Sequence, residues 1–416
     1  MSEPPRRLAV RVTPDAGRQI RAGHPWVYDA SVVSVQPDGA AGDLAVVFDE
    51  KRRFMAIGLY DPDSPIRIKV LHHGRPTPID ATFWRGRLDA ALDRRHGLVG
   101  SPLTTGYRIL HGENDQLPGL VLDRFDDTLV LKLYSAAWFA HLDEIVAVIE
   151  QRLEPSTLVL RLARNIGPAG EAVGLTDGLV LRGGPLPSPL LFLENGLRFE
   201  AEVVHGQKTG YFLDQRDNRA RVRDLSAGCR VLDVFSCSGG FSVHAAAGGA
   251  SLVHSIDISA AAIAAAKRNL LHNRDLDAVR GCTHETTVGD AARAMQRLAG
   301  DGRRFDVVVV DPPSFATRQS QVDGALHAYA HLTELALDLL VPGGTLVQAS
   351  CSSRVTAEQF FDTVHAAATG SGVRLREVSR TGHGIDHPVG FPQGAYLKAI
   401  FAAVGQRPDH RRPGRV

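Results

Sequence analysis

The chain has 416 residues, which is more than one ordinary hydrophobic core accommodates, so two or three domains are expected. Hydrophobic residues make up 44% of the sequence and charged residues 22%, as in soluble globular proteins. The formal net charge of +1 argues against a strongly basic protein that binds every polyanion, although it leaves room for a local basic groove.

Neither a signal peptide nor a membrane span is predicted. The opening sequence MSEPPRRLAV lacks an apolar run, and no apolar stretch approaches the ~20 residues that cross a bilayer. The four cysteines, Cys229, Cys237, Cys282 and Cys351, are scattered without a CxxC pair, so neither a zinc site nor another metal site is expected. We therefore expect a reduced, cytoplasmic protein that does not bind membranes.

The first 188 residues predict two domains. Residues 1–73 are β-rich, with a helix expected at 14–22 and strands at 44–48, 54–59 and 66–71. Residues 74–188 follow a turn-rich linker and predict an α+β domain. Its helices are expected at 81–98 and 137–153, and its strands at 120–125, 129–133, 157–162 and 179–181.

Residues 189–404 predict an α/β domain of Rossmann-like type. Strand-like runs at 231–235, 252–256, 307–310 and 345–349 alternate with helical stretches such as 260–271 and 325–340. This alternation is typical of a parallel sheet that is covered by helices on both faces. The tail, 405–416, is basic and proline-containing, and we expect it to be disordered.

A Gly-rich loop marks a candidate ligand site in this third domain. The strand at 231–235 runs into Ser236-Cys237-Ser238-Gly239-Gly240 and then into a helix. Gly239 and Gly240 permit close backbone approach, and the helix N-terminus offers unpaired N–H groups. The pyrophosphate-binding pattern G-x-G-x-x-G is absent, which disfavours a dinucleotide.

Acidic residues fall at the ends of four successive strands: Asp233, Asp257, Asp290 and Asp311. Each one alone is best explained as a helix N-cap or a turn residue. Because the carboxyl ends of parallel strands meet at one edge of a sheet, four of them favour a shared site. A nucleoside with a carboxylate tail, such as S-adenosylmethionine, fits this loop better than a dinucleotide does.

A thiol lies near the same edge. Cys351 follows the apolar strand at 345–350 and is expected close to Asp311. An exposed thiolate could attack C6 of a pyrimidine and make C5 nucleophilic enough to accept a methyl group, with Asp311 beside the ring. Position alone leaves a buried structural thiol equally open. Cys237, inside the Gly-rich loop, is expected to pack there or to line the cofactor site.

Several motifs together resemble one family. They are Gly206–Arg216, Phe235–Phe241, Asp311–Phe315, Ser350–Ser352 and Gly394–Lys398, with Gly23–Tyr28, Ala56–Tyr60, Tyr107-Arg108 and Leu117–Arg124 in the first two domains. They resemble the bacterial large-subunit ribosomal RNA cytosine-C5 methyltransferases that carry an N-terminal PUA domain. The resemblance covers nearly the whole chain and implies a class I methyltransferase domain, a PUA-like RNA-binding domain, S-adenosylmethionine as methyl donor and large-subunit ribosomal RNA as substrate.

The resemblance also implies that Cys351 is the nucleophile, with Asp311 as its catalytic partner. The predicted cofactor site comprises Asp233, Phe235, Ser236, Gly239, Gly240, Asp257, Asp290, Asp311 and Pro312, with Lys208, Tyr211 and Gln215 from the polar segment before the first strand. The predicted RNA contacts are Arg18, Arg21, Lys51, Arg52, Arg53 and Arg216, each of which could equally be a solvated surface charge.

The sequence departs from the family at two points. Ser314 stands where many members have lysine, and no second cysteine follows Asp311-Pro312-Pro313 to assist release of the product. Two alternatives therefore stay open: methylation of a guanine nitrogen, and an RNA-binding assembly factor without catalysis. A homodimer is compatible with the sequence, which does not fix the oligomeric state.

Overall fold

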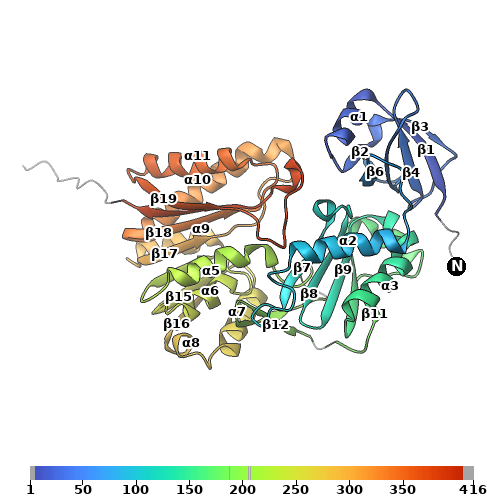
Figure 1. Cartoon of the computed structure of the whole chain (residues 1–416). Coiled ribbons are helices and arrows are strands. Elements are labelled where there is room, and N and C mark those ends of the chain that lie inside the picture. Colours follow the sequence, from blue (N-terminus) through green and yellow to red (C-terminus); the bar gives the residue numbers. More distant parts are fainter. Residues whose placement is uncertain (1–4, 187, 205, 207, 406–416) are drawn as a thin grey trace, which may run out of the picture. The chain divides into compact units, whose positions relative to one another are not determined.

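The computed structural model describes residues 5–186, 188–204, 206 and 208–405, so most of the predicted tail lies outside the described residues. The chain forms two compact units (Figure 1). Unit 1 comprises residues 1–196, 200–213 and 385–394, and unit 2 comprises residues 197–199, 214–384 and 395–416. Near its C-terminal end the chain thus passes from unit 2 into unit 1 at residues 385–394 and then returns to unit 2. The predicted domain boundaries at 73/74 and 188/189 remain predictions.

The N-terminal part of unit 1 is a six-stranded sheet with the order β2-β6-β5-β4-β1-β3. Alternating residues of β1 are buried, so Leu8, Val10 and Val12 face the core while their neighbours face solvent. Thr13 caps α1 by accepting a hydrogen bond from the backbone of Ala16. The elements are β1 (Arg7–Val12), α1 (Pro14–Arg21), β2 (Trp26–Tyr28), β3 (Val32–Gln36), β4 (Leu44–Phe48), β5 (Phe54–Tyr60) and β6 (Ile66–His73).

The middle part of unit 1 is a five-stranded sheet with the order β11-β10-β9-β8-β7. Its strands are β7 (Gly106–His111), β8 (Leu120–Phe125), β9 (Thr128–Leu133), β10 (Thr157–Leu162) and β11 (Val180–Arg182), and its helices are α2 (Ala81–Arg94), α3 (Leu142–Leu153) and α4 (Gly167–Glu171). Trp84 and Trp138 share one core with Ile57 and Leu59 of the first sheet. The two parts of unit 1 therefore bury a common apolar surface.

Two predicted helices of unit 1 differ from the structure. The helix expected at 81–98 ends at Arg94, where a turn over residues 95–100 begins, and the Arg95 side chain forms a buried ion pair with Asp115. The helix expected at 137–153 is divided, since a 3₁₀ segment at Ala136–His141 precedes α3. A two-stranded sheet of β12 (Leu190–Glu194) and β13 (Leu197–Ala201) follows the five-stranded sheet in the chain.

Unit 2 contains a seven-stranded sheet with the order β16-β15-β14-β17-β18-β20-β19. The first five strands in this order are parallel, as predicted, but β20 runs antiparallel to both β18 and β19. The strands are β14 (Arg230–Val234), β15 (Leu252–Asp257), β16 (Thr283–Val288), β17 (Phe305–Val310), β18 (Leu340–Ser350), β19 (Leu375–Thr381) and β20 (Lys398–Val404). The predicted strand at 231–235 ends at Val234, because Phe235 has a positive φ.

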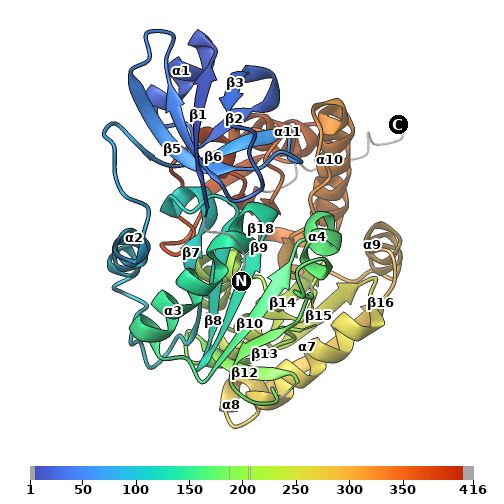
Figure 2. The same cartoon turned by 90° about the vertical axis from the view of Figure 1, so that its right-hand side faces the viewer.

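Helices cover this sheet, and α10 and α11 lie side by side (Figures 1 and 2). Leu232 and Val234 of β14 pack with α9, α10 and α11, whereas α6 packs against β14 and β15. The helices are α5 (Arg216–Asp224), α6 (Gly240–Ala247), α7 (Ala260–His272), α8 (Asp277–Gly281), α9 (Ala291–Gly300), α10 (Val322–Leu339) and α11 (Ala357–Gly370). Among the described residues, none of the helices has the length and apolarity that crossing a membrane requires.

Candidate active site

The topology of unit 2 creates a switch point beside β14. From β14 the chain moves outward to β15 and β16, and then returns to β17 on the opposite side of β14. In open α/β sheets, ligands bind at the carboxyl ends of the strands next to such a reversal. The Gly-rich loop follows β14 there, and Asp311 follows β17. The predicted site residues at these strand ends therefore share one edge of the sheet.

The Gly-rich loop has an unusual backbone. Phe235, Cys237 and Gly239 have φ values of 63°, 47° and 76°, a region that non-glycine residues rarely adopt. A Cβ atom on Gly239 would lie 2.7 Å from the Cβ of Ala266 in α7, so glycine is required for helix packing as well as for the turn. Gly240 is the first residue of α6.

Asp257 holds this loop in place. Its Oδ2 accepts a hydrogen bond of 2.9 Å from the backbone N–H of Cys237, and its Oδ1 accepts one of 2.8 Å from the N–H of Ser259. A carboxylate oxygen accepts more than one hydrogen bond, so both oxygens keep capacity for a ligand hydroxyl. The predicted contact of Asp257 with the cofactor stays a prediction, and the structure adds a positioning role for Asp257.

Two buried polar atoms at the end of β14 lack partners among the described residues. They are Oδ1 of Asp233 and Oγ of Ser236. Oδ2 of Asp233 accepts from the backbone N–H and the hydroxyl of Ser242, at 3.0 and 2.6 Å. Burial raises the pKa of Asp233 to about 6. Unsatisfied buried polar atoms are costly, so their presence here fits residues prepared for a polar ligand such as S-adenosylmethionine.

A polar chain that sequence reasoning missed extends from Asp233 across the sheet. The hydroxyl of Ser242 lies 2.7 Å from that of Ser255, which lies 2.8 Å from Nε2 of His284. Burial lowers the pKa of His284 to about 4, so the ring is neutral near neutral pH. The residues come from α6, β15 and β16, and no local pattern links them.

The remaining predicted cofactor residues have varied surroundings. Asp290 is exposed and accepts a 3.0 Å hydrogen bond from the N–H of Arg293. It is the N-cap of α9, which is the role expected for such an acid when it is considered alone. Lys208 and Tyr211 belong to unit 1, where Lys208 is exposed and Tyr211 is buried against Phe192 at 5.0 Å between ring centroids. Their contacts with a cofactor remain predictions.

Gln215 contacts Asp311 directly. Its Nε2 donates a 2.9 Å hydrogen bond to Oδ1 of Asp311. Its Oε1 accepts a 2.6 Å bond from Asn218, whose own oxygen accepts one from Thr381. This buried amide chain fixes the orientation of the Asp311 carboxylate. Sequence reasoning selected Gln215 for the cofactor, and only the fold shows its contact with Asp311.

Cys351 is the first residue after β18 and is half-buried. Its Sγ lies 3.8 Å from the carbonyl oxygen of Pro312, which follows Asp311. Both neighbours are fully buried: Ser350 lies 2.8 Å from the hydroxyl of Tyr329, and Ser352 donates a 2.8 Å bond to the carbonyl of Ala316. The segment 311–316 and the Cys351 segment are thus held together at the same edge of the sheet.

The other candidate thiol has a different environment. Burial raises the pKa of Cys237, and the nearby carboxylates Asp257 and Asp311 raise it further. A raised pKa reduces the thiolate fraction, so Cys237 suits the packing role that was predicted for it. Ser314, at the position where many family members have lysine, lies 3.3 Å from the hydroxyl of Ser352.

Comparisons with known proteins agree with this geometry. A family model described as "S-adenosylmethionine-dependent methyltransferase" matches residues 177–395, and a model described as "PUA-like domain" matches residues 10–73. The chain belongs to the S-adenosylmethionine-dependent methyltransferases. This result confirms the predicted fold class and cofactor of the methyltransferase, together with its N-terminal PUA-like domain.

Curated relatives cover nearly the whole methyltransferase. The protein named "Ribosomal RNA large subunit methyltransferase" from Deinococcus radiodurans is 50% identical over 95% of this chain and 97% of its own length. "Ribosomal RNA large subunit methyltransferase I" from Pseudoalteromonas translucida is 33% identical over 95% and 99%. A solved candidate methyltransferase complexed with SAH has a TM-score of 0.80 and 22% identity, over 96% of this chain and all of that chain, which shows a shared fold.

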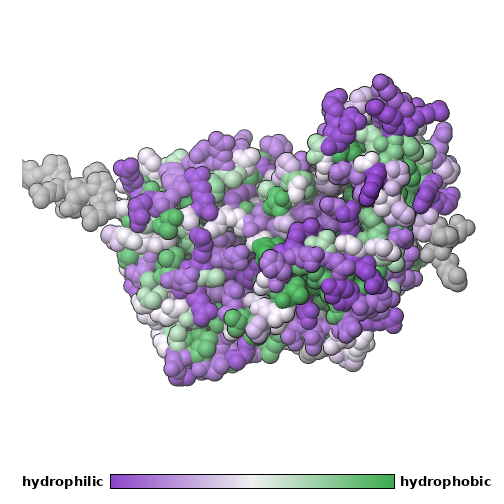
Figure 3. Space-filling model, in the orientation of Figure 1, coloured by the Kyte–Doolittle hydropathy of each residue, from purple (hydrophilic) through white to green (hydrophobic). Residues whose placement is uncertain are grey.

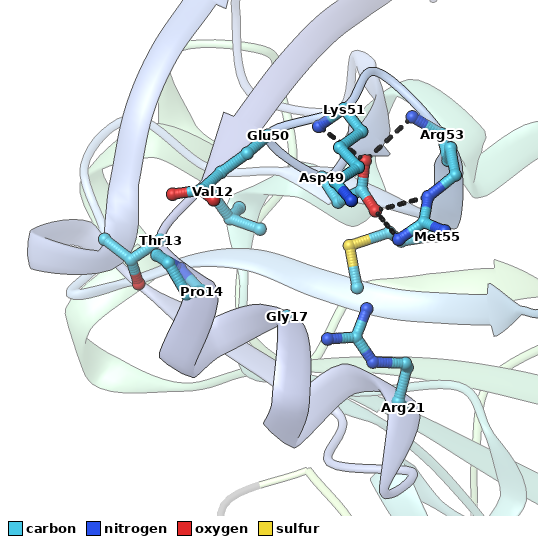
Figure 4. A pocket seen from close by; sticks show the side chains of 10 residues that line it. All are labelled: Val12, Thr13, Pro14, Gly17, Arg21, Asp49, Glu50, Lys51, Arg53 and Met55. Atoms are coloured by element: carbon cyan, nitrogen blue, oxygen red, sulfur yellow. Dashed lines mark hydrogen bonds and ion pairs between the residues drawn. The ribbon is translucent and has the colours of Figure 1, made fainter.

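The PUA-like domain of the methyltransferase gathers several of the predicted RNA contacts around one groove. Arg21 of α1 and Lys51 and Arg53 of the β4–β5 turn line it, together with the acidic residues Asp49 and Glu50 (Figure 4). The face around α1 that Figure 3 displays is mostly hydrophilic. Asp49 pairs with Arg53 at 2.7 Å, so part of the basic charge is already balanced.

The other predicted RNA contacts of the methyltransferase are distributed differently. Arg18 is exposed and pairs with Asp15 at 2.8 Å, and Arg52 is exposed in the β4–β5 turn. Arg216 is buried at the start of α5 and pairs with Asp217 at 3.3 Å. Its predicted contact with RNA remains a prediction.

Proposed function

We propose that this methyltransferase transfers a methyl group to C5 of a cytosine in large-subunit ribosomal RNA, with Cys351 as the nucleophile. One observation carries the proposal: Cys351 directly follows β18 at the edge of the sheet where Asp311 directly follows β17, and the Cys351 Sγ lies 3.8 Å from the Pro312 carbonyl oxygen. A thiol at a cofactor-binding edge is useful for pyrimidine C5 chemistry and unnecessary for methylation of a nitrogen, since a ring or exocyclic nitrogen is already nucleophilic.

The substrate class is supported by relatives and by the N-terminal domain. Relatives that cover nearly all of this chain are named ribosomal RNA large subunit methyltransferases. The PUA-like domain presents the groove lined by Arg21, Lys51 and Arg53, which suits contacts with phosphates near the target. A base inside a helix is out of reach of Cys351, so the target must be single-stranded or flipped out, at a cost of a few kcal/mol.

The chemistry follows from the order in which bonds form. The Cys351 thiolate adds to C6 of the cytosine, which places electron density at C5. Bound S-adenosylmethionine would supply the methyl group that C5 accepts, and its S–CH3 bond would break to leave S-adenosylhomocysteine. A base, either water or Asp311, then removes the proton from C5, and the C6–S bond breaks to restore the ring and release the thiolate. The hydrogen bond from Gln215 would fix the orientation of the Asp311 carboxylate during these steps.

The proposal can be tested with RNA that contains 5-fluorocytidine. Fluorine at C5 prevents the final proton removal, so the wild-type enzyme should form a stable covalent adduct in the presence of S-adenosylmethionine. Cys351→Ser should form no adduct and no 5-methylcytidine. Cys282→Ser is the matched control, because burial raises the pKa of Cys282 to about 11 and this thiol lies beside β16.

Mass spectrometry of digested natural RNA separates the possible outcomes. We expect a methylated cytidine whose retention matches 5-methylcytidine. A methylated guanosine, or full activity of Cys351→Ser, would overturn the thiol mechanism. Absence of any methylated nucleoside, despite measured S-adenosylmethionine binding, would instead favour an RNA-binding protein without catalysis.

A further inference from the structure

Lys398 is a buried charge next to the proposed nucleophile. It is the first residue of β20, its relative exposure is 4%, and it pairs in register with Ser350 of β18. The residue after Ser350 is Cys351. In the part of the chain that the structure describes, no carboxylate oxygen lies within ion-pair distance of the Lys398 ammonium. A buried cation without a carboxylate is expensive, so its surroundings need a specific explanation.

The ammonium donates to three backbone carbonyl oxygens. They belong to Ser352 at 2.5 Å, Val355 at 2.5 Å and Tyr396 at 3.2 Å. Ser352 and Val355 lie in the loop that joins β18 to α11, directly after Cys351. An ammonium has three N–H donors and a neutral amine has two, so the complete set of bonds requires the charged form. Lys398 therefore links the loop of Cys351 to β20.

The charges around this ammonium identify its electrostatic partner. Burial lowers the pKa of Lys398 to about 8, and the interaction that opposes this shift is with Cys351. Asp311, the residue after β17, lies one residue before Pro312, whose carbonyl oxygen is 3.8 Å from the Cys351 Sγ. Burial raises the pKa of Tyr329 on α10 to about 12, so this phenol is neutral at physiological pH. Exposed Arg354, on the loop itself, is solvated.

We propose that Lys398 is the positioning residue of Cys351: its ammonium clamps the β18–α11 loop and is the counter-charge of the thiolate. The inference rests on the proposed thiol mechanism and extends it, since it assigns the group that keeps Cys351 reactive. All three N–H groups of Lys398 are already committed to carbonyls, so Lys398 is not the base that removes the C5 proton.

Alkylation of Cys351 tests the proposal without any methyl transfer. Iodoacetamide is added to the full-length protein between about pH 6 and about pH 10, and the labelled Cys351 peptide is quantified by mass spectrometry. Lys398→Met removes the charge and should slow labelling near neutral pH by about tenfold or more, with its midpoint moved to higher pH. Lys398→Arg keeps the charge and should restore most of the rate.

Lys69→Met is the matched control. Lys69 is also a buried lysine with a lowered pKa, but it belongs to unit 1 and pairs with Asp61 at 2.9 Å. Its loss should leave the labelling profile of Cys351 unchanged. An unchanged profile in folded Lys398→Met, or the same slowing in Lys69→Met, would overturn the proposal.

A second measurement avoids substitution of Lys398. Cys351→Ala should shift the titration of Lys398 to lower pH, as followed by carbon-13 NMR of lysine-labelled protein, because the thiolate no longer favours the charged amine. An unmoved titration would contradict the pairing. Failure of the methylation proposal is distinguishable, since the wild-type enzyme would then form no 5-methylcytidine while both measurements on Cys351 and Lys398 kept their expected results.

Discussion

Buried aspartates have different partners in the two units. In unit 1, Asp115 accepts hydrogen bonds from Arg94 and Arg95, and Asp123 accepts from Arg108 at 2.7 and 2.8 Å. In unit 2, Asp233 is equally buried, but Ser242 supplies both bonds and its Oδ1 has no partner among the described residues. The first two carboxylates are matched by full positive charges, and the third is not.

This difference separates a structural role from a functional one. A carboxylate paired with arginines is stable as an anion and adds to the specificity of the fold. An unmatched carboxylate remains able to bind another group, at a cost to the stability of the ligand-free protein. The comparison predicts opposite effects on the free energy of unfolding. Removing the negative charge of an arginine-paired aspartate in unit 1 should lower it, and removing the negative charge of Asp233 in unit 2 should raise it.

The largest effect is expected for Asp115→Asn. The side chain of Arg95 is fully buried, and the substitution leaves it without its counter-charge. We expect a loss of about 3 to 5 kcal/mol in the free energy of unfolding, measured with urea. The affinity of the folded protein for S-adenosylmethionine should be retained, as measured by calorimetry. A loss below about 1 kcal/mol would contradict the structural role.

The second prediction has the opposite sign. Burial raises the pKa of Asp233 from 3.8 to about 6, so the folded protein holds this proton more tightly than the unfolded chain does. The stabilising contribution is present below about pH 4 and is lost as the pH rises through about 6. Asp233→Asn should therefore raise the free energy of unfolding by about 3 kcal/mol above about pH 7, and by almost nothing near pH 4.

The same substitution should weaken binding of S-adenosylmethionine by about tenfold or more, because the unpartnered oxygen is then lost to the ligand. Calorimetry and urea unfolding of the same preparations give both quantities. A variant that is less stable than the wild type at every pH would show that Asp233 is structural, as Asp115 is.

The third prediction concerns Asp311, whose carboxylate accepts from the neutral amide of Gln215. Gln215→Leu should lower kcat for methylation by about tenfold, since the carboxylate loses its orientation. Gln348→Leu is the matched control, because this buried glutamine bonds to Thr333 and Tyr329 instead. Equal losses of kcat in the two variants would mean that general destabilisation is the cause.

The smallest effect is expected at a surface carboxylate. The hydrogen bond from Arg380 lowers the pKa of Glu377 to about 2, with a further contribution from His365. The pair is partly exposed, so Glu377→Gln should cost less than about 1 kcal/mol. This contribution is present above about pH 4.5 and is lost as the pH falls through about 2, which acid titration of the unfolding free energy would measure. A larger loss of unfolding free energy would mean that Glu377 stabilises the fold as strongly as the buried aspartates Asp115 and Asp123 do.

Local patterns predicted much of the fold. The strands β4, β8 and β10 have the predicted bounds, because hydrophobic period and turn formers act within a few residues. The antiparallel insertion of β20 between β18 and β19 was not predicted, since strand order depends on contacts between distant segments. For the same reason the sequence did not show that residues 385–394 belong to unit 1. There the Asp386 carbonyl accepts from Arg95, and its carboxylate accepts from the N–H of Arg108.

The sequence by itself determined the candidate site at its strand ends: a Gly-rich loop, acidic residues after successive strands and a thiol after β18. These features are local, because a strand and the loop that follows it are read from neighbouring residues. Only the tertiary structure decided which groups partner them. Gln215 meets Asp311, and Lys398 meets the loop after Cys351, across 96 and 46 residues of sequence. Such pairings depend on how the chain folds back on itself, and no spacing in the sequence encodes them.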